Sequence, residues 1–149
     1  MAASPRKPIL VAVDGSPAAA NGLSKAVDLA RALGTEVVAV YVIPTPEFGY
    51  AMTTPVEMDP EWRAEIKREF SEDWTRPLRE SGLRFQALVE DGRPATVLAE
   101  VAERIDAEMI VVGRRGRGGI AELLLGSVSH ELALHCRHPL LLISPPRGA

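Results

Sequence analysis

Five short segments rich in apolar residues constrain the fold of this chain more than any other feature of its sequence. They lie at Ile9–Val13, Glu36–Ile43, Leu83–Glu90, Met109–Val112 and Pro139–Ser144. Apolar runs of about four to eight residues are typical of strands that are buried on both faces, because buried helices are usually longer. Such strands occur mainly in parallel sheets, in which a right-handed crossover connects each strand to the next.

Segments with helical periodicity separate the predicted strands. They follow Pro17, run from about Glu61 to Trp74, occupy Pro94–Ile105, and extend from Ser127 to about Cys136. This alternation predicts an α/β fold with an open, mainly parallel five-stranded sheet, flanked by about four helices and doubly wound in the Rossmann-like manner. No linker, repeat or low-complexity segment interrupts the sequence, so we expect a single domain over residues 1–149 with an ordered core at about 8–144.

Several residues mark the expected ends of these helices. Ser16 and Pro17 are suited to the first helix's N-cap and first turn, and Gly34 to its C-terminal end. Pro77 should kink or end the second helix. Four apolar residues predict the buried face of that helix because they fall four positions apart: Trp62, Ile66, Phe70 and Trp74.

The stretch from Pro44 to Pro60 is predicted to be a long loop. Its prolines, with Gly49, exclude a regular helix or central strand from its first part. Two roles are open for this loop: it folds over a ligand as a lid, or it covers the sheet edge.

The composition excludes several function classes. The net charge of −3 gives no basic excess for nucleic acid, and no apolar run is long enough to span a bilayer or to act as a signal peptide. Cys136 is the only cysteine, so an internal disulfide is excluded and a reducing, cytoplasmic location is expected. We therefore expect no nucleic acid and no membrane as partners.

The connection from Gly113 to Ser127 carries the strongest functional signal. Gly113 is followed by two residues, Gly116, nine residues, and the pair Gly126-Ser127. Glycines let a large anion approach the backbone, and a helix beginning at Ser127 directs free amides and a positive dipole end at it. The hydroxyls of Ser127 and Ser129 are further phosphate donors. A glycine-rich turn without a ligand has the same spacing, so both interpretations stay open on the pattern alone.

Other known site patterns do not match. The residue before Gly126 is Leu125 and no lysine precedes Ser127, which excludes a P-loop, and no G-x-G-x-x-G follows the first predicted strand. No serine lies in G-x-S-x-G, so catalysis by serine is not expected. The cluster of His130, His135, Cys136 and His138 has a spacing that matches no zinc pattern.

Four blocks of the sequence resemble the universal stress protein family, and the resemblance covers nearly the whole chain. They are ILVAVDGS at Ile9–Ser16, VYVI at Val40–Ile43, DAEMIVVGRRG at Asp106–Gly116, and LGSV at Leu125–Val128 continuing to His138-Pro139. The spacing G-x-x-G, nine residues, G-[ST] is similar to that family's ATP-binding signature. The resemblance implies the adenine nucleotide alpha hydrolase-like variant of the fold and places this chain in the ATP-binding subgroup.

The same resemblance implies roles for individual residues. Ala12, Val13, Asp14 and Val42 are expected near the adenine and ribose. Val112, Gly113 and Gly116 are expected near ribose and phosphate, with Arg115 beside them. Gly126, Ser127, Val128 and Ser129 are expected at the phosphates of ATP, ADP or AMP, with Mg²⁺ held by phosphate oxygens and no metal site formed by protein ligands alone.

Asp14 and the arginines keep two interpretations each. The Asp14 carboxylate either contacts the ribose or metal or bonds the amides of the turn at Gly15 and Ser16, and these roles are compatible. Arg114 stands where many relatives have a smaller residue. Together with Arg115 and Arg117 it either attracts phosphates or belongs to a solvated loop.

Three functional hypotheses follow. The first is an ATP-binding stress-response or signalling module without a catalytic residue. The second is a slow ATPase or a phosphoryl or nucleotidyl transferase in which Asp14 acts with a metal. The third is a dimeric interaction module that binds no ATP. The family resemblance also suggests a homodimer through Leu140–Ile143, with an unknown protein partner, and an exposed apolar edge strand gives that suggestion a physical basis.

Overall fold

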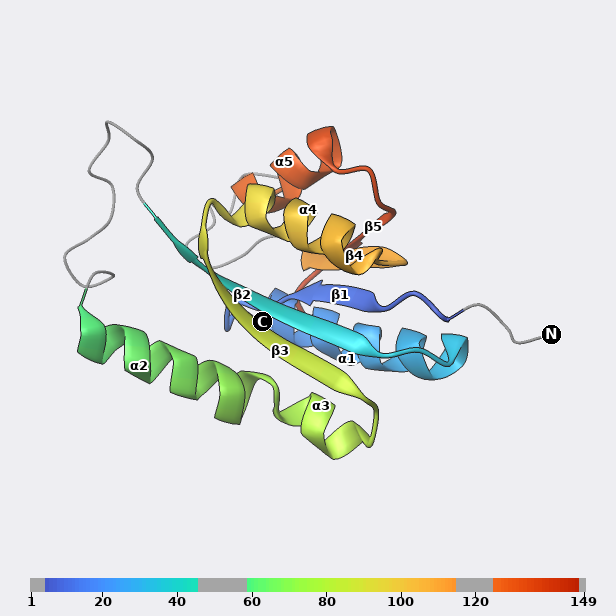
Figure 1. Ribbon diagram of the computed structural model, residues 1–149, viewed down its shortest axis with the longest axis horizontal. Coiled ribbons are helices and arrows are strands. Elements are labelled where there is room, and N and C mark those ends of the chain that lie inside the picture. The colour runs from blue at the N-terminus through green and yellow to red at the C-terminus, as the bar shows by residue number, and fades with distance from the viewer. Residues whose placement is uncertain (1–4, 46–58, 115–124, 148–149) are drawn as a thin grey trace.

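The computed structural model describes residues 5–45, 59–114 and 125–147. Along the chain it contains β1 (Ile9–Ala12), α1 (Pro17–Leu33), β2 (Val37–Pro44), α2 (Pro60–Glu69), a π-helical turn η1 (Phe70–Trp74), α3 (Arg76–Ser81), β3 (Phe85–Gly92), α4 (Pro94–Ile105), β4 (Met109–Gly113), α5 (Ser127–His135) and β5 (Leu140–Ile143) (Figure 1). Because α2, η1 and α3 follow one another almost without a break, the described part of the chain has the expected four helical segments.

All five strands form one parallel sheet in the order β3-β2-β1-β4-β5. The sequence prediction of an open, parallel, doubly wound α/β fold is therefore confirmed. The chain winds outward from β1 through β2 to β3, and then returns to the other side of β1 with β4 and β5. This reversal between β1 and β4 opens a crevice beyond their carboxyl ends, which is where ligands bind in sheets of this kind.

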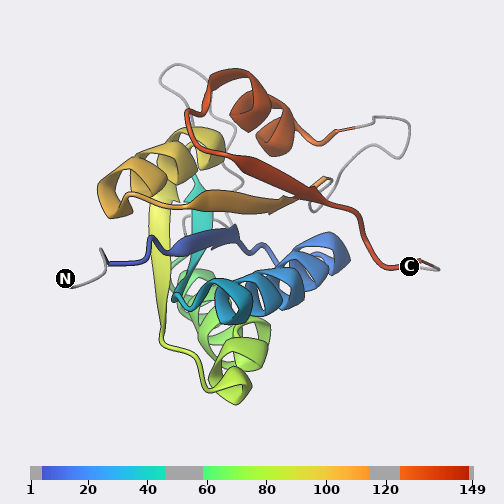
Figure 2. The same cartoon turned by 90° about the vertical axis from the view of Figure 1, so that its right-hand side faces the viewer.

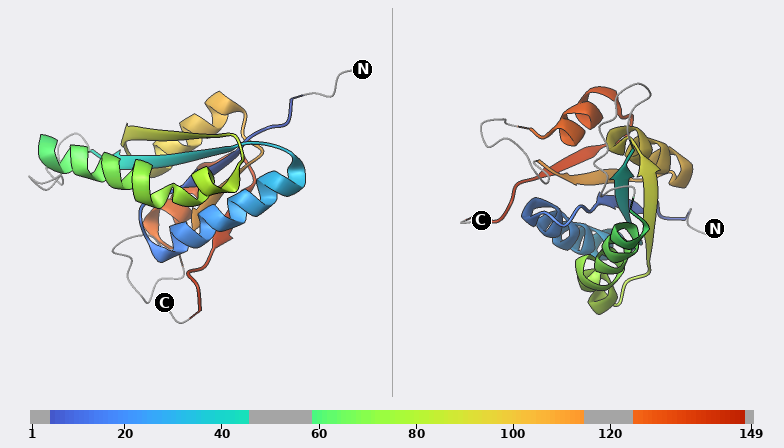
Figure 3. Two further views of the ribbon diagram at one scale, coloured as in Figure 1. Left: turned by 90° about the horizontal axis from the view of Figure 1, so that it is seen from below. Right: turned by 90° about the vertical axis from the view of Figure 1, so that its left-hand side faces the viewer.

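The sheet separates two helical layers. Helices α1, α2 and α3 cover one face, while α4 and α5 cover the other (Figures 2 and 3). Side chains alternate along each strand, so successive residues of β1 enter different layers: Val11 packs in the α1 layer and Leu10 in the α4 layer. Both layers consist mainly of Val, Ile, Leu and Ala, as expected for strands that are buried on both sides.

The predicted signals at the ends of α1 act as expected. The Ser16 hydroxyl oxygen accepts a hydrogen bond from the Ala19 amide at 3.1 Å, and Pro17 is the first helical residue. Gly34 ends the helix with a φ of 67°, and its N–H donates to carbonyl oxygens of the last turn.

The second helical segment has the predicted apolar face. Ile66 and Phe70 are buried, and Trp62 and Trp74 pack partly buried against the same core. Near Pro77 the helix changes form as predicted. The Thr75 amide bonds to the Phe70 carbonyl, five residues earlier, at 3.1 Å, and α3 then begins at Arg76.

The second and third strands differ slightly from their predicted bounds. Pro44 ends β2 instead of beginning the loop, because a strand's last residue can lack an N–H donor. The third strand begins at Phe85, two residues later than predicted, and extends to Gly92 alongside β2. Residues 46–58, which hold most of the predicted loop and its lid alternative, lie outside the described residues.

Candidate functional site

Sheet register brings the ends of β1, β2 and β4 to one level. Ala12 lies opposite Val40 of β2, so Asp14, two residues further on, is level with Val42. On the other side Val11 lies opposite Val111 of β4, which makes Asp14 level with Arg114. Residues from three predicted parts of the site therefore meet at the carboxyl edge of the sheet, next to the crevice.

Four predicted site residues belong to one apolar cluster. Val42 and Val112 are buried in the layer beneath α4 and α5, and Ala12 and Val128 pack against the same cluster. Val13 is not among them, because it faces the opposite layer, beneath α1, and is 4% exposed. The α4–α5 side of the carboxyl edge thus presents small and branched apolar side chains, the kind of surface against which a purine ring packs.

Asp14 stabilises the turn that follows β1. One of its carboxylate oxygens accepts a hydrogen bond from the Ser16 amide at 2.9 Å, and Gly15 between them has a φ of 81°. The structural role expected for Asp14 is therefore present. Its carboxylate lies half-buried at the edge of the crevice.

Helix α5 begins with amides that no helical carbonyl accepts. Gly126 is its N-cap and has no side chain to cap the helix, and the first bond of the helix runs from His130 N–H to Gly126 C=O at 2.9 Å. The amides of Ser127, Val128 and Ser129 precede that first bond. Ser127 is exposed at this end. The start of α5 can therefore receive an anion.

The Ser129 hydroxyl has a different environment from the one expected for a phosphate donor. It is 2% exposed and lies 2.9 Å from the Arg114 carbonyl oxygen and 3.1 Å from that of Gly126, to both of which it donates. This hydrogen bond connects the start of α5 to the end of β4. Sequence reasoning missed that role because it depends on a contact between residues 15 positions apart.

Part of the predicted site lies outside the described residues. Gly113 is the last residue of β4 and is half-buried at the crevice. Arg115, Gly116 and Arg117 fall within 115–124, which the structure does not describe. Their expected contacts with ribose and phosphate stay predictions.

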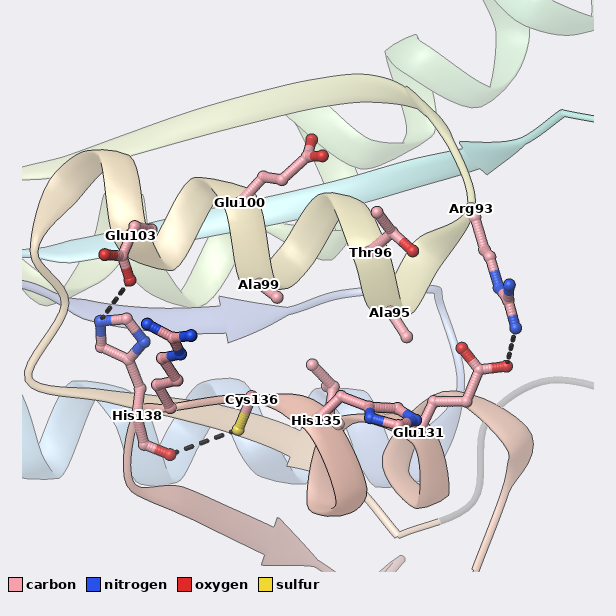
Figure 4. A pocket seen from close by; sticks show the side chains of 12 residues that line it. Arg93, Ala95, Thr96, Ala99, Glu100, Glu103, Glu131, His135, Cys136 and His138 are labelled. Carbon is pink, nitrogen blue, oxygen red and sulfur yellow. Dashed lines mark hydrogen bonds and ion pairs between the residues drawn. The ribbon is translucent and has the colours of Figure 1, made fainter.

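A second concave feature lies between α4 and α5. This groove has a volume of about 450 Å³ and contains none of the predicted nucleotide residues. Figure 4 shows the ion pair between Arg93 and Glu131, with an N–O distance of 2.6 Å, at one end and the contact between His138 and Glu103 at the other. The Cys136 thiol donates to the His138 carbonyl oxygen at 3.3 Å.

The described residues contain neither a metal site nor a membrane-spanning helix. No group of three or more His, Cys, Asp or Glu side chains in this part of the chain is arranged to hold a metal ion. Within the same ranges, no helix has both the length and the apolar character needed to cross a membrane.

Comparison with known proteins identifies the family. The model of the universal stress protein family matches residues 5–144. A universal stress protein of Bacillus subtilis is 31% identical over 143 residues, which cover 91% of this chain and 97% of that protein.

Solved structures of universal stress proteins have the same fold as this chain. The universal stress protein from Archaeoglobus fulgidus matches with a TM-score of 0.71 and 27% identity, over 93% of this chain and 94% of that one. A second structure from that organism, in complex with dAMP, has a TM-score of 0.69 and 26% identity, over 93% of this chain and 98% of the other. With its fold and these matches in agreement, the chain belongs to the universal stress protein family.

Proposed function

We propose that this protein binds ATP in the crevice beyond β1 and β4 and acts as a nucleotide-dependent stress-response or signalling module. The observation that carries the proposal is the start of α5, where a glycine N-cap leaves three amides ahead of the first helical hydrogen bond at the crevice. The dAMP complex of the Archaeoglobus fulgidus protein supports an adenine nucleotide as the ligand.

In this proposal, different residues contact the adenine, the ribose and the phosphates of ATP. Ala12, Val42 and Val112 supply the apolar surface for adenine and ribose, and Asp14 adds a carboxylate for a ribose hydroxyl or a metal. The amides at the start of α5 receive phosphate oxygens, together with the Ser127 hydroxyl. Gly113, Arg115 and Gly116 complete the proposed site, which Val13 borders through its backbone because its side chain packs beneath α1. Mg²⁺ bound by the phosphates would neutralise part of their charge.

The proposal extends to assembly and location. β5 ends the sheet, with β4 as its single neighbour, and its Leu142 is 37% exposed. Edge strands with apolar side chains tend to pair with another chain, so we propose a homodimer through Leu140–Ile143. A cytoplasmic location belongs to the same proposal, because ATP is available there.

Thermal melting with and without Mg-ATP tests the proposal. At about a hundred times its dissociation constant, ATP should raise the free energy of unfolding by about 2.7 kcal/mol. Gly116→Trp should abolish the shift by placing an indole in the proposed phosphate path, while Gln86→Trp, at an exposed position of β3, should keep it.

Two results would contradict this proposal in favour of another function. The absence of a shift in the wild type would contradict ATP binding and favour an interaction module without nucleotide. Phosphate release in proportion to enzyme concentration, lost on Gly116→Trp, would instead favour the slow ATPase.

A further inference from the structure

Arg114 is held at the carboxyl edge by its backbone. Its N–H donates to the Ile143 carbonyl at 2.6 Å, and its own carbonyl oxygen accepts from the Gly126 amide at 2.7 Å and from the Ser129 hydroxyl at 2.9 Å. These contacts join β4, β5 and the start of α5 at one residue. The position of the Arg114 backbone relative to the free amides of α5 is therefore well determined.

The side chain of Arg114 contains a buried donor without an acceptor. Its Nε is buried and has no hydrogen-bond partner within the part of the chain that the structure describes. A buried donor left in this state is destabilising, and more so where the group is charged, as arginine always is in proteins. A ligand atom that accepts a hydrogen bond from this Nε would remove that destabilisation.

Other arginines in the described ranges form ion pairs with carboxylates, whereas Arg114 forms none there. Arg63 and Arg93 each place a guanidinium nitrogen 2.6 Å from a carboxylate oxygen, and Arg104 does so at 3.0 Å. Arg114 takes part in none of the ion pairs found between described residues. Among the described residues its charge therefore has no carboxylate partner.

The surroundings of Arg114 favour phosphate as that anion. The amides of Ser127, Val128 and Ser129 at the start of α5 are donors, and the positive end of the helix dipole lies with them. A guanidinium adds a planar set of N–H donors that matches phosphate oxygens in pairs. The Arg114 guanidinium and the amides of α5 therefore both complement negative charge, and the Asp14 carboxylate is the anionic group at the same edge of the sheet.

We propose that Arg114 is a specificity-determining residue that binds phosphate oxygens and favours nucleoside polyphosphates over monophosphates and nucleosides. The inference rests on the proposed function, because it concerns the same crevice. Each added phosphate increases the charge that a fixed cation attracts, whereas the apolar contacts of Ala12 and Val42 with the base stay the same.

Equilibrium binding of ATP, AMP and adenosine tests the inference by isothermal titration calorimetry. Arg114→Ser should weaken ATP binding by about 10- to 100-fold, as expected for a charge-assisted hydrogen bond, and should leave adenosine binding within about threefold. AMP should fall between them. Arg114→Lys, which keeps the charge without the planar fork, should recover part of the ATP affinity. Arg137→Ser removes an exposed arginine beyond α5 and is the matched control, with all three affinities unchanged.

The melting temperature of the ligand-free variant provides a second measurement. Removing a buried, unsatisfied donor should leave the stability of Arg114→Ser equal to or above that of the wild type. A loss of stability would mean that the guanidinium has a partner within the protein, and would overturn the inference.

The binding outcomes separate the two proposals. Equal loss of ATP and adenosine affinity on Arg114→Ser, or no loss of either, would overturn the role of Arg114 while nucleotide binding stands. A wild-type protein that binds none of the three ligands would overturn both.

Discussion

Gly15 lies against the indole ring of Trp74. A Cβ at Gly15 would lie 2.6 Å from Cζ2 of Trp74 and 2.8 Å from its Cε2, closer than real Cβ contacts. The same ring packs against Tyr41 of β2 in a T-shaped arrangement, with ring centroids 5.2 Å apart. The π-helical turn η1 thus places a rigid aromatic side chain against the turn that carries Asp14.

Substitution of Gly15 by alanine should destabilise the protein. The methyl group would meet the indole, and the φ of 81° is itself unfavourable for alanine. Backbone strain and overpacking together should lower the free energy of unfolding by about 2–4 kcal/mol in urea denaturation.

Gly34→Ala is the control for the backbone contribution. Its φ of 67° is similar, but no atom lies within 4 Å of the position of its Cβ. It should therefore cost only about 1–2 kcal/mol. Equal losses for the two variants would show that the contact with Trp74 has no energetic weight.

Substitutions of Ser127 and Ser129 should have different effects on ATP binding and on the stability of the protein. Ser129→Ala removes a buried hydroxyl that bonds to Arg114 and Gly126, and should lower the free energy of unfolding by about 0.5–1.5 kcal/mol. Ser127→Ala is exposed and should change it by less than about 0.5 kcal/mol, while weakening ATP binding. Calorimetric titration and chemical denaturation of both variants check the pair. A larger stability loss for Ser127→Ala than for Ser129→Ala would contradict it.

Local chemistry in the sequence was enough to predict much of this fold. Pro94 and Ile105 bound α4 as predicted, because a proline start and a regular apolar face are both local signals. Ser16 and Gly34 likewise mark the ends of α1. Carboxyl-edge positions for Asp14 and Val42 also followed from the sequence, since parallel strands direct their carboxyl ends to one side.

Contacts between distant parts of the chain could not be predicted in this way. The alternating pattern implies a parallel sheet but does not specify that β1 lies between β2 and β4. The contact of Trp74 with Gly15, and the bond from Ser129 to the Arg114 carbonyl, depend on how finished elements pack. An aromatic residue at four-residue spacing indicates a buried helix face without indicating which backbone it meets.

Glu65 should titrate at a lower pH than an ordinary glutamate. Its carboxylate accepts hydrogen bonds from the Arg68 guanidinium, and this bonding, followed by the attraction of the Arg68 charge, lowers its pKa. NMR titration of the side-chain carboxyl should show the shift, and Arg68→Gln should reverse most of it.

The effect of this pair on stability should be small. Because the folded pKa is depressed, any stabilisation is present above the pKa of the unfolded chain and is lost as the pH falls through the folded value. Both side chains are solvent-exposed, so the melting temperature of Arg68→Gln at neutral pH should match that of the wild type. A clear drop would mean that the pair is more than a surface contact.

Leu142→Arg should convert the proposed dimer into monomers. Leu142 is the exposed residue of β5, and in a pair of β5 strands it would face its neighbours across a two-fold axis. Arginines brought together there would repel each other, and charged residues on an edge strand oppose further pairing. Gln86→Arg is the matched control, because Gln86 is exposed on β3, the strand at the opposite edge of the same sheet. Sedimentation equilibrium should give a dimer for the wild type and for Gln86→Arg, and a monomer for Leu142→Arg with unchanged circular dichroism. A dimer that persists in Leu142→Arg would exclude β5 as the interface, and ATP titration of the monomer would then show whether binding depends on assembly.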